Sequence, residues 1–206
     1  MQFLMLPVWL IPLLPYVQGL EGGADWVFAC GLLIGIGTFA SPLVGMFADR
    51  FLNAEKVLAI CNALTAALLG AAFFVKDPAV LFGVMLAAML VYMPTWSVSS
   101  AIVLAHAPAA TFARIRAIGS IGWVASGLFS VIGAKFFGVA NFDATPWIFA
   151  SGAAAALLGA AIALTLPATP PRAKGTPMSV VDALGFKAFA LFRDPTFAAF
   201  GLLVTL

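Results

Sequence analysis

The stretch AVLFGVMLAAMLVYMPTWSVSSAIVLA, residues 79–105, contains no charged residue. About 20 apolar residues in an α-helix cross the hydrocarbon core of a bilayer, so this stretch predicts a membrane-spanning helix. The whole chain has the same character, because 64% of its 206 residues are hydrophobic and 9% are charged, with a mean hydropathy of +1.12. In soluble domains roughly a quarter of the residues are charged. The composition therefore predicts an all-α polytopic membrane protein.

Several functional classes are disfavoured by what the chain contains. A net charge of +2 provides no basic stripe for nucleic acid. Cys30 and Cys61 lie inside apolar stretches and are interpreted as small core residues. The single histidine, His106, is interpreted as a solvated loop residue. The chain has no metal-spaced cluster of ligands, no phosphate-binding glycine loop and no Ser/His/Asp set. We therefore expect neither an enzyme nor a bound cofactor or metal.

Charged and turn-forming residues divide the chain into six apolar spans. Their approximate bounds are 2–19, 26–48, 57–75, 79–105, 115–138 and 146–166. A seventh apolar run, 196–206, covers about half of the hydrocarbon core. We expect an N-terminal six-helix bundle at 1–167, a cytoplasmic linker with an interfacial helix at 168–195, and the truncated start of a seventh span at 196–206. This layout is typical of one half of a transporter built from two six-helix bundles.

The basic residues are distributed unequally between the two sides of the predicted membrane. When loops are assigned alternately to the two sides, only Lys76 and Lys135 fall on one of them. The other side receives Arg50, Lys56, Arg114, Arg116, Arg172, Lys174, Lys187 and Arg193. Under the positive-inside rule this second side is cytoplasmic. The N-terminus is then predicted inside.

Small residues are frequent in the spans, where they allow helices to approach closely. The glycines concerned are Gly31, Gly35, Gly37, Gly119, Gly122, Gly127, Gly152 and Gly159. This pattern predicts close helix packing and carries no information about a substrate.

Span five carries a polar stripe. Arg116, Ser120 and Trp123 recur at i, i+4 and i+7, which places them on one helix face. A cation, a hydroxyl and an aromatic ring would suit the wall of a polar cavity. The alternative is that Arg116, like Arg114, anchors the cytoplasmic end while Trp123 faces lipid. An arginine deep in a span costs about 2.5 to 3.5 kcal/mol, so inside the bundle it would need a partner or a function.

Span four carries a second stripe around a proline. Tyr92, Thr95, Trp96 and Ser99 share one face, and Pro94 removes a backbone hydrogen bond there. A proline kink is tolerated in a membrane where neighbours or a cavity satisfy the freed carbonyl. Two interpretations remain open: a cavity wall, or hydroxyls that bond back to their own helix.

Span one places Gln2, Trp9 and Tyr16 near one face, seven residues apart each time. Trp9 is a candidate for the cavity wall. Gln2 and Tyr16 lie near the predicted membrane boundaries, which favours an interfacial position for both.

The loop after span two reads Gly45-Met-Phe-Ala-Asp49-Arg50. Glycine one turn before the carboxylate would allow close helix approach, and Asp49 would be stabilised near a helix N-terminus. Asn53 is predicted to cap span three, with Glu55 in its first turn.

These motifs resemble known sequences. Gly45-x-x-x-Asp49-Arg50 is similar to the core of the loop signature of the major facilitator superfamily, although 53–56, Asn-Ala-Glu-Lys, replace its usual glycine and basic pair. Other motifs resemble the N-terminal half of the bacterial nucleoside:proton symporter family. They are Tyr92-Met-Pro-Thr95, residues 115–123 (IRAIGSIGW), Gln2-Phe3 with Trp9-Leu10 and Tyr16, and residues 188–193 (AFALFR).

The resemblance implies twelve helices around a central cavity that opens alternately to each side while a proton accompanies a nucleoside. Arg116 and Ser120 match positions that hydrogen-bond the substrate, and Trp123 matches an aromatic position of the base pocket. With the stripes above, the predicted substrate-binding set is Arg116, Ser120, Trp123, Tyr92, Thr95 and Trp9, and the predicted gating loop is Gly45, Asp49 and Arg50.

The resemblance also implies the surroundings of the chain. The expected partners are a nucleoside, a proton, the lipid bilayer and a C-terminal six-helix half that holds the remaining substrate contacts. The expected location is the inner membrane of the cell. Two alternatives remain: a facilitator-superfamily transporter of another small solute, and a non-transporting membrane scaffold derived from a transporter half.

Overall fold

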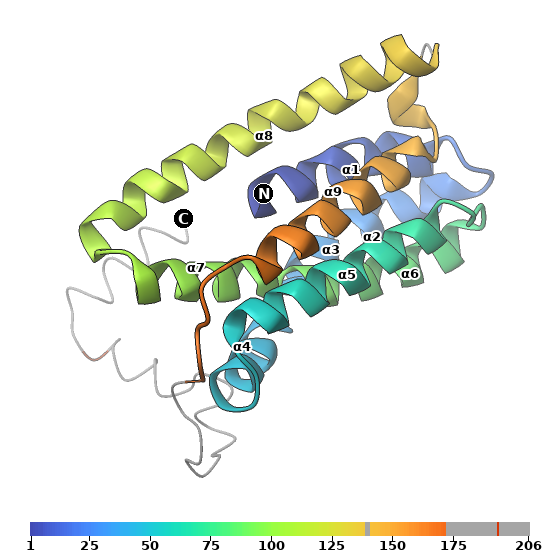
Figure 1. Cartoon of the computed structure of the whole chain (residues 1–206). Coiled ribbons are helices and arrows are strands. Elements are labelled where there is room, and N and C mark those ends of the chain that lie inside the picture. Colours follow the sequence, from blue (N-terminus) through green and yellow to red (C-terminus); the bar gives the residue numbers. More distant parts are fainter. Residues whose placement is uncertain (139–140, 172–192, 194–206) are drawn as a thin grey trace.

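A computed structural model describes residues 1–138, 141–171 and 193, and within them every regular element is helical (Figure 1). The α-helices are α1 (Gln2–Gln18), α2 (Val27–Gly31), α3 (Leu33–Thr38), α4 (Ser41–Arg50), α5 (Ala54–Ala72), α6 (Pro78–Tyr92), α7 (Pro94–His106), α8 (Ala109–Phe137) and α9 (Trp147–Leu164). Short 3-10 helices occur at Gly23–Trp26 and Phe142–Ala144. The predicted interfacial helix and the seventh span lie outside the described residues.

The predicted all-α polytopic fold is confirmed. Among the described residues four helices are long and apolar enough to cross a membrane: α5, α6 with α7, α8 and α9. A fifth crossing arises if the bent pair Gly23–Gly31 and Leu33–Arg50 counts as one span. Helix α1 is apolar but has only 17 residues. Each of the six predicted spans therefore corresponds to helical structure.

Two of the predicted spans are interrupted. The second is divided into α2, α3 and α4, with a bend of 41° near Leu32. Gly31, Gly35 and Gly37 weaken the helix there, since glycine has low helix propensity. The fourth breaks at Met93, because Pro94 at the start of α7 cannot donate a backbone hydrogen bond.

Helix α5 occupies the middle of the fold and α8 its edge. Helix α5 packs against α9, α6 and α7, whereas α1 joins α9 to α8. Figure 1 shows α8 as a long helix on one side, separate from α5 and α6. The largest fully buried side chains include Trp9, Tyr92 and Phe149, from α1, α6 and α9. The core therefore lies between these helices, away from the outer face of α8.

Some of the glycines act as the sequence predicted and others do not. A Cβ on Gly152 would lie 2.6 Å from Trp9 Cδ1, and one on Gly37 would lie 2.9 Å from Met89 Cβ. These distances are too short for a side chain, so both positions require glycine. By contrast, a Cβ at Gly31, Gly35, Gly45 or Gly127 would meet no atom of the described residues within 4 Å. The close approach predicted at Gly45 is therefore wrong for this arrangement of helices.

The segment after α9 is bound to the ends of α5 and α7. Thr169 donates its backbone N–H to Glu55 Oε2 at 2.8 Å and accepts from the backbone N–H of Ala54 at 3.0 Å. Its hydroxyl lies 2.9 Å from His106 Nε2. Asn53 occupies the N-cap position of α5 but makes no side-chain capping bond. His106 is exposed as expected, yet it has a protein partner rather than water alone.

Candidate functional site

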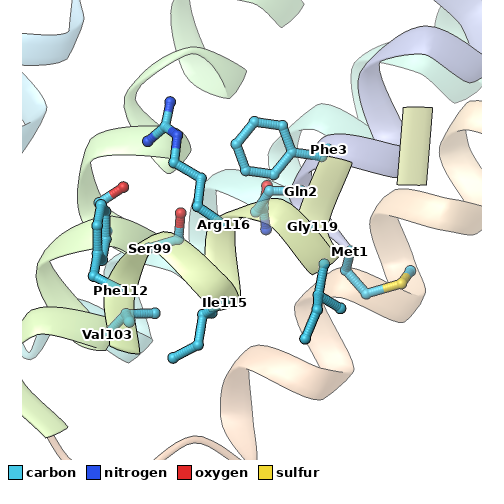
Figure 2. Close-up of a pocket in the computed structure, with 11 residues that line it drawn as sticks. Met1, Gln2, Phe3, Ser99, Val103, Phe112, Ile115, Arg116 and Gly119 are labelled. Atoms are coloured by element: carbon cyan, nitrogen blue, oxygen red, sulfur yellow. The ribbon is translucent and has the colours of Figure 1, made fainter. Parts of the chain in front are cut away.

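A cavity of about 310 Å³ lies between the start of α1, α7 and the first half of α8. We call it the Arg116 cavity. Its walls include Gln2, Phe3, Ser99, Phe112, Arg116 and Gly119. Figure 2 shows the Arg116 guanidinium beside the Phe3 ring, with Gln2 and Ser99 close by. One of the predicted site residues, Arg116, thus lines a cavity together with residues from two other helices.

Arg116 is held against an aromatic pair. Its Cζ lies 5.5 Å from the centre of the Phe3 ring, which is within the range of a cation–π interaction. The Phe3 ring in turn packs on Trp96, with ring centres 4.8 Å apart and planes tilted by 42°. Gly119 permits this arrangement, because a Cβ there would lie 3.0 Å from Phe3 Cδ2. Among the described residues no carboxylate pairs with Arg116, so its donors face the cavity side of α8 uncompensated.

Gln2 is buried and partly unpaired. It is 9% exposed, and its Oε1 has no hydrogen-bond partner among the described residues. Its backbone carbonyl accepts from the Tyr92 hydroxyl, which also accepts from Trp96 Nε1 at 3.0 Å. Gln2 thus packs inside the fold, and so does Tyr16, which is 6% exposed and packs edge-to-face on Phe149. Their interfacial position in the membrane stays a prediction.

Serine and threonine hydroxyls of span four bond back to their own span. Ser99 and Ser100 donate to the Trp96 carbonyl at 3.0 and 2.8 Å, and Thr95 donates to the Tyr92 carbonyl at 2.6 Å. This was one of the two interpretations left open by the sequence. Ser99 and Ser100 nonetheless line the Arg116 cavity, and each hydroxyl oxygen retains acceptor capacity toward it.

The other predicted binding residues lie outside the cavity walls. Ser120 is exposed and donates to the Arg116 carbonyl at 3.2 Å, and Trp123 is 37% exposed. Both lie on α8 after Arg116, on the same side of the helix. Trp9, Tyr92 and Thr95 are buried in the core. Tyr92 still acts on the cavity indirectly, since it connects Gln2 to Trp96. The substrate roles of all six remain predictions.

The predicted gating loop lies at the end of α4. Asp49 is exposed and lines a small cavity together with Ala54, Thr169 and Pro170. Ala54 begins α5, so Asp49 does lie near a helix N-terminus, as expected. Arg50 ends α4. The gating role of the three residues is a prediction.

Sequence reasoning missed several walls of the Arg116 cavity. Phe3, Ser100 and Phe112 line it, but none belongs to a stripe that the sequence analysis assigned to a cavity. The one available signal was the position of Phe3 beside Gln2, within a matched motif. Only the packing of α1 on α8 brings Phe3 under Arg116.

The walls of the cavity combine a cation, an amide and an aromatic ring. Arg116 supplies donors and Phe3 supplies an aromatic surface, while Gln2 lies in the wall with its Oε1 buried. Ligand sites are commonly apolar pockets of roughly 300 Å³ or more with a few convergent polar groups, and this cavity has that character. The geometry therefore fits a binding site for a small solute.

The apolar helices and this cavity define a multi-pass membrane protein with a solute-sized site between its helices. Comparison with known proteins gives the family. The profile of the nucleoside H⁺ symporter family matches residues 1–206, and the chain belongs to that family of transporters.

Individual relatives agree. The chain is 37% identical to Escherichia coli YegT over 200 residues, covering 93% of this chain and 46% of YegT. It is 35% identical to the xanthosine permease of Escherichia coli over 176 residues, covering 82% and 40% of the two chains. A crystal structure of the nucleoside transporter NupG, in a mutant form, superposes with a TM-score of 0.70 at 27% identity, covering 97% of this chain and 50% of that one. The chain thus spans half or less of the length of these relatives.

Proposed function

We propose that the complete protein carries nucleosides across the inner membrane of the cell, coupled to protons, by alternating access. The observation that carries this proposal is the Arg116 cavity, in which a cation, a buried amide and an aromatic surface converge within a nucleoside H⁺ symporter sequence. A nucleoside presents ribose hydroxyls to such polar groups and a flat base to such rings.

In this proposal Arg116 hydrogen-bonds the substrate, and Ser120 and Trp123 extend the binding surface along the exposed flank of α8. Trp9, Tyr92 and Thr95 support that surface from behind. Gly45, Asp49 and Arg50 act at the cytoplasmic gate, and the N-terminus is cytoplasmic, as the bias in basic residues supports. A second six-helix half would supply the remaining contacts and the proton-coupling groups.

The test is uptake by the full-length protein in proteoliposomes. Radiolabelled uridine and adenosine would be offered with an inward proton gradient, without a gradient, and with a protonophore. We expect the gradient to drive accumulation above equilibrium and the protonophore to abolish it. Uptake that ignores the gradient would contradict proton coupling. Transport of a sugar or peptide but no nucleoside would favour the alternative solute, and the absence of any transport by a folded protein would favour the scaffold.

A further inference from the structure

Arg116 contacts a ring that belongs to the start of α1. Its Cζ lies over the Phe3 ring, 5.5 Å from the centre. The arginine side chain is exposed, and within the described part of the chain no carboxylate pairs with it. A long arginine side chain loses rotamer freedom when its guanidinium binds a solute, which weakens binding. A contact that already holds the guanidinium reduces this loss, because preorganised groups bind more strongly.

The Phe3 ring is itself held from behind. It packs on Trp96, with ring centres 4.8 Å apart. Trp96 donates its Nε1–H to the Tyr92 hydroxyl at 3.0 Å, and that hydroxyl donates to the backbone carbonyl of Gln2, the residue before Phe3. These contacts form a closed loop that joins the start of α1 to α6 and α7. The ring beneath Arg116 therefore has a fixed position relative to those helices.

Glycines of α8 allow α1 to approach on this side. A Cβ on Gly119, about one turn after Arg116, would lie 3.0 Å from Phe3 Cδ2. A Cβ on Gly122, about one turn further, would lie 3.0 Å from the backbone nitrogen of Leu4. Larger residues there would push α1 and α8 apart. Side chains three residues apart share one helix face, so the glycines bring Phe3 within reach of Arg116.

Two roles at a solute site are open to the Phe3 ring. It could stack directly on a solute, or it could act through Arg116. The geometry favours the second role, because the guanidinium already lies over the ring. Trp96 and the backbone of α8 at Gly119 contact other parts of the same ring. Most of the Phe3 ring is therefore already engaged by the protein.

We propose that Phe3 is a positioning residue for Arg116, and that its ring, fixed by Trp96, holds the guanidinium at the Arg116 cavity before a solute arrives. The effect on solute binding rests on the proposed function, in which Arg116 hydrogen-bonds a nucleoside. The contact between Phe3 and Arg116 does not depend on that function.

The contact is tested without solute, in the full-length protein in nanodiscs with isotope-labelled arginine. The Nε–H signal of Arg116, identified by its loss in Arg116→Ala, should lie upfield because of the ring current of Phe3. In Phe3→Leu, which keeps an apolar side chain but no ring, this signal should move downfield. The Arg114 signal is the internal control and should not move. An unchanged Arg116 signal in folded Phe3→Leu would overturn the proposal.

The effect on binding is measured by isothermal titration with uridine. We expect Phe3→Leu to weaken uridine binding about two- to fivefold, as the loss of a cation–π contact at an exposed site predicts. In the Arg116→Ala background the same substitution should weaken binding no further, because no guanidinium is left to position. Equal losses in both backgrounds would overturn the proposal and assign Phe3 a direct contact with the solute. A parent protein that binds no uridine would contradict the proposed function, while the arginine signal would still decide the contact.

Further variants separate positioning from packing. Phe3→Tyr retains the ring and should bind uridine like the parent, so a loss equal to that of Phe3→Leu would count against the ring. Leu4→Ala loosens the same contact between α1 and α8 at Gly122, but Leu4 lies outside the walls of the Arg116 cavity. It should lower the unfolding temperature and leave uridine affinity unchanged. An equal loss of affinity in Leu4→Ala would attribute the effect of Phe3→Leu to loosened helix packing. If Phe3→Leu does not fold, Phe3→Met replaces it, because methionine adapts to irregular spaces.

Discussion

Helices α5 and α8 are both apolar spans that contain polar residues, yet they occupy opposite environments. In the most apolar 18-residue stretch of each helix, 56% is buried in α5 but only 11% in α8. Three polar residues of α5, Glu55, Asn62 and Thr65, are inside the fold, whereas Arg116 and Ser120 of α8 are exposed on its flank. Helix α5 is therefore a structural axis, and α8 is a surface that the proposed function uses.

The largest difference should appear when one valine is added to each region. Gly152→Val places a side chain where a Cβ is already 2.6 Å from Trp9 and 3.0 Å from Leu69, which belongs to α5. Overpacking of this kind costs about 1 to 3 kcal/mol, so we expect a lower unfolding temperature and poor monodispersity in detergent. Gly127→Val on α8 adds a Cβ that meets no atom of the described part of the chain within 4 Å, so this variant should unfold like the parent. Equal losses of stability in both variants would abolish the contrast.

The second prediction separates binding from folding on α8. Arg116→Ala should weaken nucleoside binding by about 10- to 100-fold, because a hydrogen bond to a charged group contributes about 1.5 to 3 kcal/mol. Its unfolding temperature should hardly change, since the side chain is exposed. Arg114→Ala, two residues earlier and outside the cavity walls, is the matched control. Isothermal titration with uridine measures the affinity of both variants, and thermal unfolding measures their stability. Unchanged affinity in Arg116→Ala would return this arginine to the role of a membrane anchor.

A third prediction concerns the connection between the core and the cavity. Tyr92→Phe removes the hydroxyl that bonds the Gln2 carbonyl and Trp96 Nε1. We expect a loss of about 1 kcal/mol in stability, typical of a buried hydrogen bond, together with a severalfold weaker nucleoside affinity. Thermal unfolding and titration of the same sample measure the two effects. Full affinity with reduced stability would show that Tyr92 supports only the core.

The smallest effect is expected at the N-terminal end of α5. Glu55→Gln replaces a charge-assisted acceptor of the Thr169 N–H by a neutral one, which should cost about 1 kcal/mol locally. Amide hydrogen exchange at Thr169 should then accelerate about fivefold. Glu21→Gln, at an exposed position, should change nothing. Unaltered exchange at Thr169 in the first variant would mean that the Ala54 and His106 contacts hold the segment without Glu55.

Sequence reasoning located the helices well and the cavity only in part. Span edges were predictable because apolar length and charged residues between the spans are local signals. Arg116 was predictable as a cavity candidate because an arginine among apolar residues needs a reason to be there. The burial of Gln2 was not predictable, because it depends on a contact with Tyr92, 90 residues away. The attachment of Thr169 to Glu55 joins positions 114 residues apart and was missed for the same reason.

The sequence by itself determined the membrane class, the order of the helices and the family, since hydrophobicity, helix length and short motifs are properties of adjacent residues. Only the tertiary structure decided which polar groups are satisfied. Asn62 and Thr65 look alike in the sequence of α5. Thr65 is satisfied by its own helix, whereas Asn62 lies between α1 and α9 without a protein partner among the described residues. That difference arises from helix packing, because burial becomes costly only where neighbouring helices exclude water from a polar group without bonding it.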